Sequence, residues 1–458
     1  MRLVNTIMLR KYKALSIKAI CSVLALSTGS TLLAQDNSPY SRYGLGNLVP
    51  NTNISTRGMG GISAAYADRL SVNFNNPASY SNFQAYLEER SGRMASGRVL
   101  LDVGLNFENR TLREPDQPQK FTSSNALFSY LQVGIPLRKN WGLTFGLRPI
   151  SRVYYKVGVT EPLYNHQTGN FIDSTYTEYT GDGGTFLPSI GTGYAIKNFS
   201  VGVNVGYLFG KKEIGIRRAF LKQPADYYPS FYRSNASFGD IYFNAGAQYR
   251  IKMSSRTFLS LGVSGNLQQD ISASQDIVRE VYSNSNIIDT VFYQKNVKGS
   301  VTYPASYTGG LVLESTFGNT GSYLFGADFI QSKWSDYRYF GRIDSVQDNW
   351  QLRVGGHYRP NAKAGSGYFS NVTYRAGFFY GNDYIKVDNT IPQFGISFGM
   401  GLPLANYNRL SPGQYTIINL ALEYEKRGNN SNLLKEDMFR LSVGLNFSDL
   451  WFTKRRYD

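Results

Sequence analysis

The sequence contains few side chains of the kinds that carry out catalysis or bind metals. It has two histidines, His166 and His357, and one cysteine, Cys21. His357 lies between Arg353 and Arg359, whose charges disfavour a protonated imidazole, and no nearby serine and acid complete a triad. Two isolated histidines also fall short of the ligand set of a metal centre. We therefore expect no enzyme activity, no metal and no cofactor.

Three arginines and one aromatic residue are the candidates for ligand binding. Arg148, Arg353 and Arg375 fall on the polar face of their predicted strands, and Phe379 shares the parity of Arg375. An inward guanidinium can pair with a ligand carboxylate through two hydrogen bonds. The alternative is that these arginines pair with interior acids such as Glu423, or with carbonyl groups of an interior segment.

The elements that would position these residues alternate between apolar and polar side chains. Leu101, Val103, Leu105 and Phe107 share one face of such a segment. Fourteen strands are predicted, at residues 99–108, 125–137, 141–157, 184–196, 199–217, 237–253, 257–271, 299–314, 321–334, 349–359, 371–381, 392–402, 414–427 and 437–448. Strands with one apolar face, in a chain with 15% aromatic residues and 46 glycines, are typical of a transmembrane β-barrel.

The predicted connections alternate between short and long. Tight turns fall at 138–140, 197–198 and 254–256, and long connections fall at 109–124, 158–183, 218–236 and 272–298. Outer-membrane barrels have short periplasmic turns and long external loops. Aromatic residues at predicted strand ends indicate an interfacial girdle formed by Trp141, Tyr155, Trp334 and Trp451. A soluble β-sandwich is the alternative, because sandwich strands can alternate too.

The N-terminus is predicted to be an export signal. A basic region that ends at Lys18 is followed by an apolar run, and Ala34 completes a cleavage motif. We assign residues 1–34 to the signal peptide, 35–97 to an N-terminal hatch, 98–449 to the barrel and 450–458 to a basic periplasmic tail. The net charge of +16 is scattered along the chain. This pattern favours anionic lipid head groups or acidic ligands over nucleic acid.

A compact irregular segment, 57–79, precedes the alternating strands and is rich in Gly, Ala and Asn. Irregular backbone at membrane depth is tolerated only where protein or water surrounds it, so we expect this segment to plug the lumen. The candidate hatch residues are Arg57, Gly58, Gly60, Gly61, Asp68, Asn76, Pro77 and Ala78.

Two parts of the chain resemble the FadL/TodX family of outer-membrane transporters for hydrophobic compounds. The glycine-rich start at 57–61 and Asn76-Pro77-Ala78 are similar to that family's hatch, and 375–378 with 399–401 resembles its late strands. The resemblance implies a fourteen-stranded barrel in the outer membrane, closed by the hatch. Relatives in the superfamily include a barrel subunit of the type IX secretion system.

Pro149 interrupts the third predicted strand. A proline donates no ladder hydrogen bond and forces a bulge or a local gap in the sheet. In the resembled family, a kink in the third strand opens a lateral exit to the bilayer, which makes Pro149 the candidate for a lateral opening. The alternative is that Pro149 simply ends a short strand.

Two functions are compatible with the sequence. The first is passive uptake of small hydrophobic compounds such as long-chain fatty acids, with outer-membrane lipid and a hydrophobic small-molecule ligand as partners. The second is a non-transporting, FadL-like barrel that serves as a docking subunit of a protein secretion machine. In that case the tail Lys454-Arg455-Arg456 would bind a periplasmic or secretion-system protein.

Overall fold

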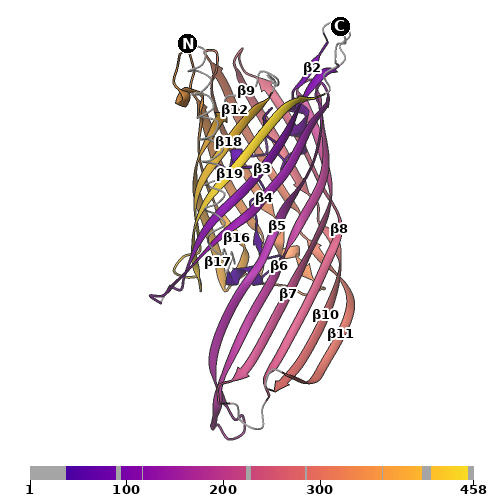
Figure 1. The fold of residues 1–458 in the computed structure, drawn as a ribbon, viewed down its shortest axis with the longest axis vertical. Coiled ribbons are helices and arrows are strands. Elements are labelled where there is room, and N and C mark those ends of the chain that lie inside the picture. Colours follow the sequence, from indigo (N-terminus) through magenta and orange to yellow (C-terminus); the bar gives the residue numbers. More distant parts are fainter. Residues whose placement is uncertain are drawn as a thin grey trace, which may run out of the picture. The chain divides into compact units, whose positions relative to one another are not determined.

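The described residues fold into a closed antiparallel β-barrel of fourteen strands, which confirms the predicted fold class (Figure 1). The computed structural model describes residues 38–88, 94–115, 117–222, 228–283, 286–363, 365–404 and 414–451. The uninterrupted barrel strands are β3 (Met94–Arg113), β4 (Lys120–Arg138), β5 (Trp141–Tyr164), β6 (Phe171–Ile196), β7 (Phe199–Phe220), β8 (Ser230–Lys252), β13 (Gly321–Ser332), β15 (Asn349–Arg359), β16 (Thr373–Val387), β17 (Asn389–Leu404), β18 (Tyr415–Arg427) and β19 (Lys435–Trp451). Pairing of β19 with β3, in which Val443 lies opposite Leu105, closes the barrel.

Two positions of the wall are each formed by a strand with a break. β9 (Thr257–Asn266) is continued by β10 (Gln269–Ser283), and β11 (Asn286–Tyr303) is continued by β12 (Ser306–Phe317). Pro304, which cannot donate to a ladder, lies at the second break. Short strands β2 (Ala85–Leu87) and β14 (Arg338–Tyr339) pair with β3 and β11. Short helices η3 (Trp334–Asp336) and η4 (Tyr368–Asn371) lie in connections between strands.

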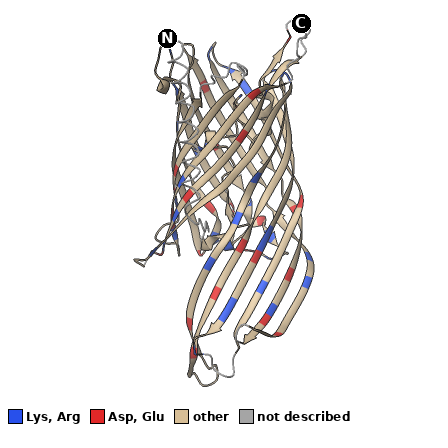
Figure 2. Ribbon diagram, in the orientation of Figure 1, with Lys and Arg blue, Asp and Glu red and all other residues tan. Residues whose placement is uncertain are grey.

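Six strands continue past the barrel wall as an open sheet that forms the lower part of Figure 1. This extension consists of the outer halves of β5, β6, β7 and β8 together with β10 and β11, with pairs such as Val157 and Tyr179. The prediction of long loops at 158–183, 218–236 and 272–298 is therefore largely wrong. The strands of this sheet carry charged and polar side chains, as Figure 2 shows, and lack the apolar alternation that marks the wall.

Apolar side chains cover the outside of the wall. Phe145, Ile190, Phe243 and Phe398 are exposed there, and Figure 2 shows few charges along this band. Such a surface suits hydrocarbon, and the protein is an outer-membrane barrel. Short turns mark the periplasmic end, which places the extension outside the cell. None of the helices in the described residues is long and apolar enough to cross a membrane.

Aromatic residues form part of the expected girdle at the periplasmic end. Trp141 packs edge-on against Tyr194, with ring centroids 6.4 Å apart. Trp451 is also exposed. Trp334 and Tyr155 are buried in the interior, at 3% exposure each, so their prediction as girdle residues is wrong. Parity in a strand shows which residues share a face, but Trp334 follows the end of its strand and turns inward.

The N-terminal segment, which we define as residues 38–83, lies inside the barrel and is mostly buried. It contains η1 (Pro39–Arg42), β1 (Asn47–Leu48), α2 (Ile54–Arg57) and η2 (Pro77–Asn82). Asn53 caps α2 by accepting from the Thr56 amide, and Asn76 caps η2 by accepting from the Ala78 amide. Barrel strand β3 begins at Met94, slightly before the predicted boundary at residue 98.

Candidate functional site

A row of glycines on the inner wall allows η2 to touch the backbone of the barrel. Gly142, Gly193, Gly202 and Gly246 lie opposite one another on β5, β6, β7 and β8. A Cβ atom added at Gly202 would lie 2.3 Å from the carbonyl carbon of Pro77. Any larger residue there would have to displace the segment from the wall.

A second row accommodates the turn after α2. Gly326, Gly355 and Gly377 are paired on β13, β15 and β16, and a Cβ at Gly377 would lie 2.0 Å from the Gly60 nitrogen. Gly60 itself has φ of +70°, in the left-handed region that favours glycine. The backbone of the segment therefore packs directly on the backbone of the wall.

Replacing Gly202 by alanine is expected to loosen the N-terminal segment. The added methyl group overlaps the Pro77 backbone, and overpacking of this kind costs about 1–3 kcal/mol. Limited proteolysis of the folded protein in detergent should then cut the segment faster than in the wild type. Gly309→Ala is the matched control, because no atom lies within 4 Å of a Cβ at that position. Equal protection of both variants would contradict the role of the glycine row.

Buried ion pairs attach the middle of the segment to the wall. Arg57 is 1% exposed, and its guanidinium donates to Asn106 Oδ1 at 2.6 Å and Ser442 Oγ at 3.2 Å. Arg57 Nε also lies 3.8 Å from Glu423 Oε2. Glu423 is shared with Arg440, at 3.4 Å. Arg57 is thus part of a continuous network of buried charges.

The same network continues along β19 towards the extracellular end. Arg440 Nε lies 2.7 Å from Glu108 Oε1, and Arg110 lies 2.9 Å from Glu436. Ser38, the first described residue, donates to Glu436 at 2.5 Å. Alternation in β3 and β19 placed these residues on the polar face, but one sequence cannot show which charges meet.

Carboxylate and amide side chains hold the rest of the segment. Asp328 Oδ2 accepts from the Ser63 amide at 2.5 Å and the Ala64 amide at 2.9 Å. Asn76 Nδ2 donates to the Ala64 carbonyl at 2.5 Å and to the Val263 carbonyl at 3.2 Å. These bonds satisfy irregular backbone that is buried inside the barrel at membrane depth.

The other predicted hatch residues lie in the same interior segment. Gly58 packs on Gly399, and Ala78 is fully buried in η2 behind Pro77. Asp68 accepts from the Leu70 amide at 3.1 Å and from Ser71 Oγ at 3.0 Å, which shapes a local turn. Gly61, with φ of +81°, lies against the guanidinium of Arg353.

The three predicted ligand-binding arginines have different surroundings. Arg353 Nη1 donates to the Gly61 carbonyl at 3.0 Å, and Arg375 Nη1 donates to Asn419 Oδ1 at 2.9 Å. Arg148 is 5% exposed and stacks on Phe74, with 4.9 Å from its Cζ to the ring centroid. Its Nη1 has no hydrogen-bond partner among the described residues. Arg375 Nε also lacks a partner among the described residues, but of the three arginines Arg148 is the one with a free donor that lines a cavity.

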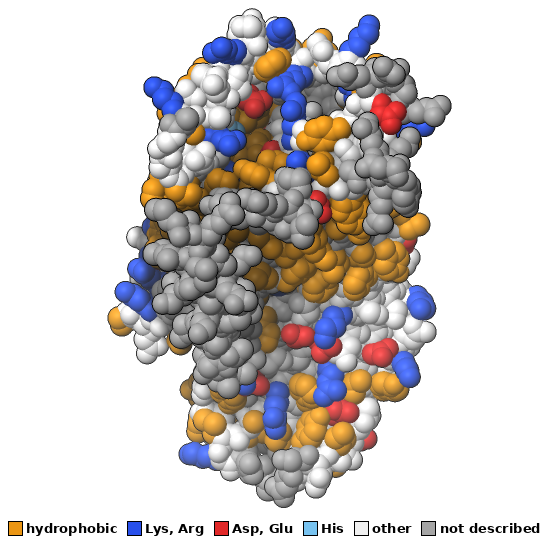
Figure 3. Space-filling model, turned by 45° about the horizontal axis from the view of Figure 1, so that its top comes forward, with side chains coloured by type: hydrophobic (Ala, Val, Ile, Leu, Met, Phe, Trp, Pro, Cys, Tyr) orange, Lys and Arg blue, Asp and Glu red, His pale blue; other side chains and the backbone are white. Residues whose placement is uncertain are grey.

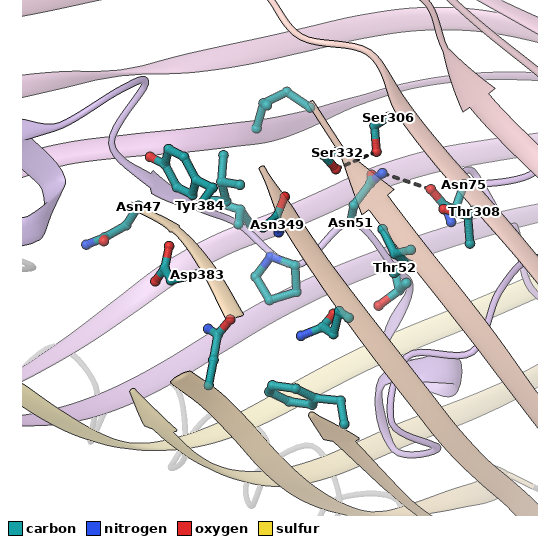
Figure 4. Close-up of a pocket in the computed structure, with 18 of the residues that line it drawn as sticks. Asn47, Asn51, Thr52, Asn75, Ser306, Thr308, Ser332, Asn349, Asp383 and Tyr384 are labelled. Atoms are coloured by element: carbon teal, nitrogen blue, oxygen red, sulfur yellow. Dashed lines mark hydrogen bonds between the residues drawn. The ribbon is translucent and has the colours of Figure 1, made fainter. Parts of the chain in front are cut away.

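A cavity of about 280 Å³ lies between the N-terminal segment and the wall, and Arg148 lines it. Aromatic rings form part of the lining, namely Tyr242, Tyr303, Trp334, Tyr384 and the predicted Phe379. Amide and hydroxyl groups form another part, as Figure 4 shows for Asn51, which donates to Asn75 at 2.8 Å, and for Ser306 beside Ser332. The cavity is therefore amphipathic, with an unpaired cation in its wall.

The wall is interrupted next to this cavity. The ladder between β4 and β5 ends where Leu131 pairs with Leu147, and no further β4–β5 backbone pair is found in the described residues. Pro149 follows at once, and the β5–β6 register shifts between Pro149 and Ser151. Strand β1 lies along β5 at this place, with Leu48 opposite Ser151. The N-terminal segment thus covers the interrupted wall from inside.

Within the described residues, no group of three or more His, Cys, Asp or Glu side chains could hold a metal ion. His357 lies 3.5 Å from Ser322 Oγ, at the limit of a hydrogen bond. The features of this interior that bear on function are the amphipathic cavity, the interrupted wall and the segment between them.

These features define an outer-membrane β-barrel whose lumen is filled by its own N-terminal segment. The sequence model of the BamG family matches residues 16–458, and the chain belongs to this family. A comparison with curated proteins found no match.

Solved structures share the fold. The CymD monoaromatic hydrocarbon channel is 14% identical with a TM-score of 0.52, covering 89% of this chain and 98% of that one. A FadL homologue of Pseudomonas aeruginosa is 15% identical with a TM-score of 0.50, covering 90% and 100%. The predicted resemblance to FadL-type barrels is confirmed at the level of the fold.

Proposed function

We propose that the protein is a passive outer-membrane channel for small hydrophobic compounds that carry an acidic or polar head, such as long-chain fatty acids. The observation that carries this proposal is the amphipathic cavity beside the interrupted wall. Its volume of about 280 Å³ is near the lower end of ligand sites, which are roughly 300–1,000 Å³. The structural neighbours with a similar fold include a hydrocarbon channel.

Arg148 would bind the head of the ligand. A buried guanidinium without a partner is costly, so a bound carboxylate would relieve that cost through charge-assisted hydrogen bonds. Aromatic rings such as Tyr242 and Tyr303 would receive the apolar tail. In this mechanism the N-terminal segment acts as the hatch. Its displacement from β5 would let the ligand leave beside Pro149 into the bilayer, driven by the partition of apolar solute from water.

Replacing Arg148 by glutamine is expected to weaken binding of a long-chain carboxylate. Loss of hydrogen bonds to a charged group costs about 1.5–3 kcal/mol, or about 10- to 150-fold in affinity. Binding of a fluorescent fatty acid to the purified protein measures this loss, and the matched long-chain alcohol should lose much less. The control is Arg375→Gln, an interior arginine that already has Asn419 as its partner. Equal losses for carboxylate and alcohol would contradict a head-group role for Arg148.

A docking role is the second candidate. The extracellular sheet of β5–β8, β10 and β11 favours it, because β11 ends this sheet with exposed side chains from Asn286 to Asn296. Exposed apolar residues there include Val291 and Tyr293. Contiguous apolar surface outside the membrane is a feature of protein-binding sites. The predicted partner-binding tail, 454–456, lies outside the described residues. This role would be favoured if the purified protein bound neither the long-chain carboxylate nor the alcohol but retained a stable partner protein.

A further inference from the structure

The periplasmic turns carry exposed cations at neighbouring places on the rim. Arg138 and Lys139 lie between β4 and β5, Lys197 between β6 and β7, and Lys252 and Arg256 at the turn between β8 and β9. These strands are consecutive in the wall, so the three turns are adjacent. We call these five residues the basic arc. In the described part of the chain, none of the five takes part in an ion pair.

Each turn of the basic arc also exposes an apolar side chain. Leu137 is 37% exposed, Ile196 61% and Met253 62%. No acidic residue lies in 137–141, 196–199 or 250–257. A cation beside an exposed apolar group at each turn is the combination that a membrane interface favours, because the apolar group meets acyl chains while the cation meets phosphate.

The aromatic girdle fixes the level of the basic arc relative to the bilayer. Trp141 and Tyr194 lie at the periplasmic ends of β5 and β6, and Phe199 pairs with Tyr249 on β7 and β8. Aromatic residues of this kind sit at the level of lipid head groups. The cations follow within a few residues. In Figure 3, which tilts this end of the barrel forward, Lys and Arg side chains lie above the hydrophobic band.

We propose that the basic arc binds the head groups of anionic phospholipids in the periplasmic leaflet. Five unpaired cations just past the girdle lie where phosphates of that leaflet are, and the apolar neighbours would anchor each turn. Such binding would fix the tilt and depth of the β4–β9 side of the barrel, the side that contains the interrupted wall. An acidic periplasmic protein is the other possible occupant, and the experiment distinguishes the two.

The test measures the lipid preference of the full-length protein. Wild type and the variant R138Q/K139Q/K197Q/R256Q are placed in nanodiscs of phosphatidylcholine with a minor fraction of phosphatidylglycerol, and bound lipids are counted by native mass spectrometry. We expect the wild type to retain phosphatidylglycerol preferentially. Each cation near the surface contributes about 1 kcal/mol, or about fivefold in affinity, so the loss of four cations should lower this preference by about fivefold or more.

The matched control neutralises four exposed cations away from the basic arc, as K120Q/K295Q/K298Q/K386Q. It should keep the preference of the wild type, and heat-modifiable electrophoretic mobility should show that both variants are folded. A preference for phosphatidylglycerol that declines as the salt concentration is raised would also support the proposal. A wild type without preference, or a four-site variant that retains it, would overturn the proposal. So would an acidic protein that binds the basic arc while phosphatidylglycerol does not.

Discussion

Replacing Arg57 by alanine is expected to release the N-terminal segment from the wall of the folded barrel. Arg57 donates to three side chains from β3, β4 and β19, at Asn106, Ser129 and Ser442, and to the carbonyls of Pro50 and Thr52. It also lies beside Glu423. Removing one member of a buried charge network costs about 3–5 kcal/mol, because its partners lose their compensation.

The barrel itself should survive this change. Its ladders close without Arg57, so the cost should appear as local opening of the segment and not as loss of the whole fold. A loss of about 3–5 kcal/mol from the closed state raises the open population by about two to nearly four orders of magnitude. Arg57→Lys should rescue the effect in part, because it restores the charge without the planar five-donor fork.

Thiol labelling measures the opening directly. Ser55, which is 3% exposed in α2, is replaced by cysteine after Cys21, the one cysteine of the sequence, is replaced by serine. Maleimide should label this cysteine faster by the same two to nearly four orders of magnitude when Arg57 is absent. Arg217→Ala, at an exposed position of the extension, is the control. If the labelling rates of the Arg57 and Arg217 variants agree, Arg57 does not hold the segment.

Period-two alternation was sufficient to predict the wall. Leu101, Leu105 and Phe107 face outward in β3, and the partner strand β19 has the same pattern at Phe439 and Leu441. The extension could not be predicted in this way. Its strands place polar side chains on both faces, and even buried positions such as Thr175 and Thr177 are polar and carry no apolar period. Extended structure there depends on pairing with neighbouring strands, which one sequence does not show.

The interior was predictable by residue type but not by partner. Parity placed Arg148, Arg353 and Arg375 on the inner face, where all three lie. Which of these arginines lacks a hydrogen-bond partner depends on the path of the N-terminal segment. Arg353, for example, donates to the Gly61 carbonyl of that segment. The glycine rows had a signal in the sequence, because Gly202, Gly246 and Gly193 all occupy inward positions. Only the pairing register shows that they adjoin.

Locking β1 onto β5 is expected to stop uptake completely if the ligand leaves beside Pro149. Leu48 lies directly opposite Ser151, next to the hydrogen bond from the Val49 amide to the Ile150 carbonyl. This makes Leu48 and Ser151 a non-hydrogen-bonded antiparallel pair, whose Cα atoms are about 4.5 Å apart. That spacing permits a disulfide, so Leu48→Cys with Ser151→Cys should cross-link on oxidation.

The cross-link would prevent the N-terminal segment from moving off the interrupted wall, while leaving Arg148 unchanged. Leu48 lines the cavity, so the reduced form of the same variant is the reference for the effect of the substitutions themselves. Uptake of a labelled long-chain carboxylate into cells or proteoliposomes should fall to background in the oxidised protein. A reducing agent should restore it, so the same molecule serves as its own reference. Asn109→Cys with Ser124→Cys cross-links two neighbouring wall strands, β3 and β4, and should leave uptake unchanged. Transport that is insensitive to the β1–β5 disulfide would exclude this lateral route. If binding also depended on Arg148, the ligand would instead have to pass toward the periplasm.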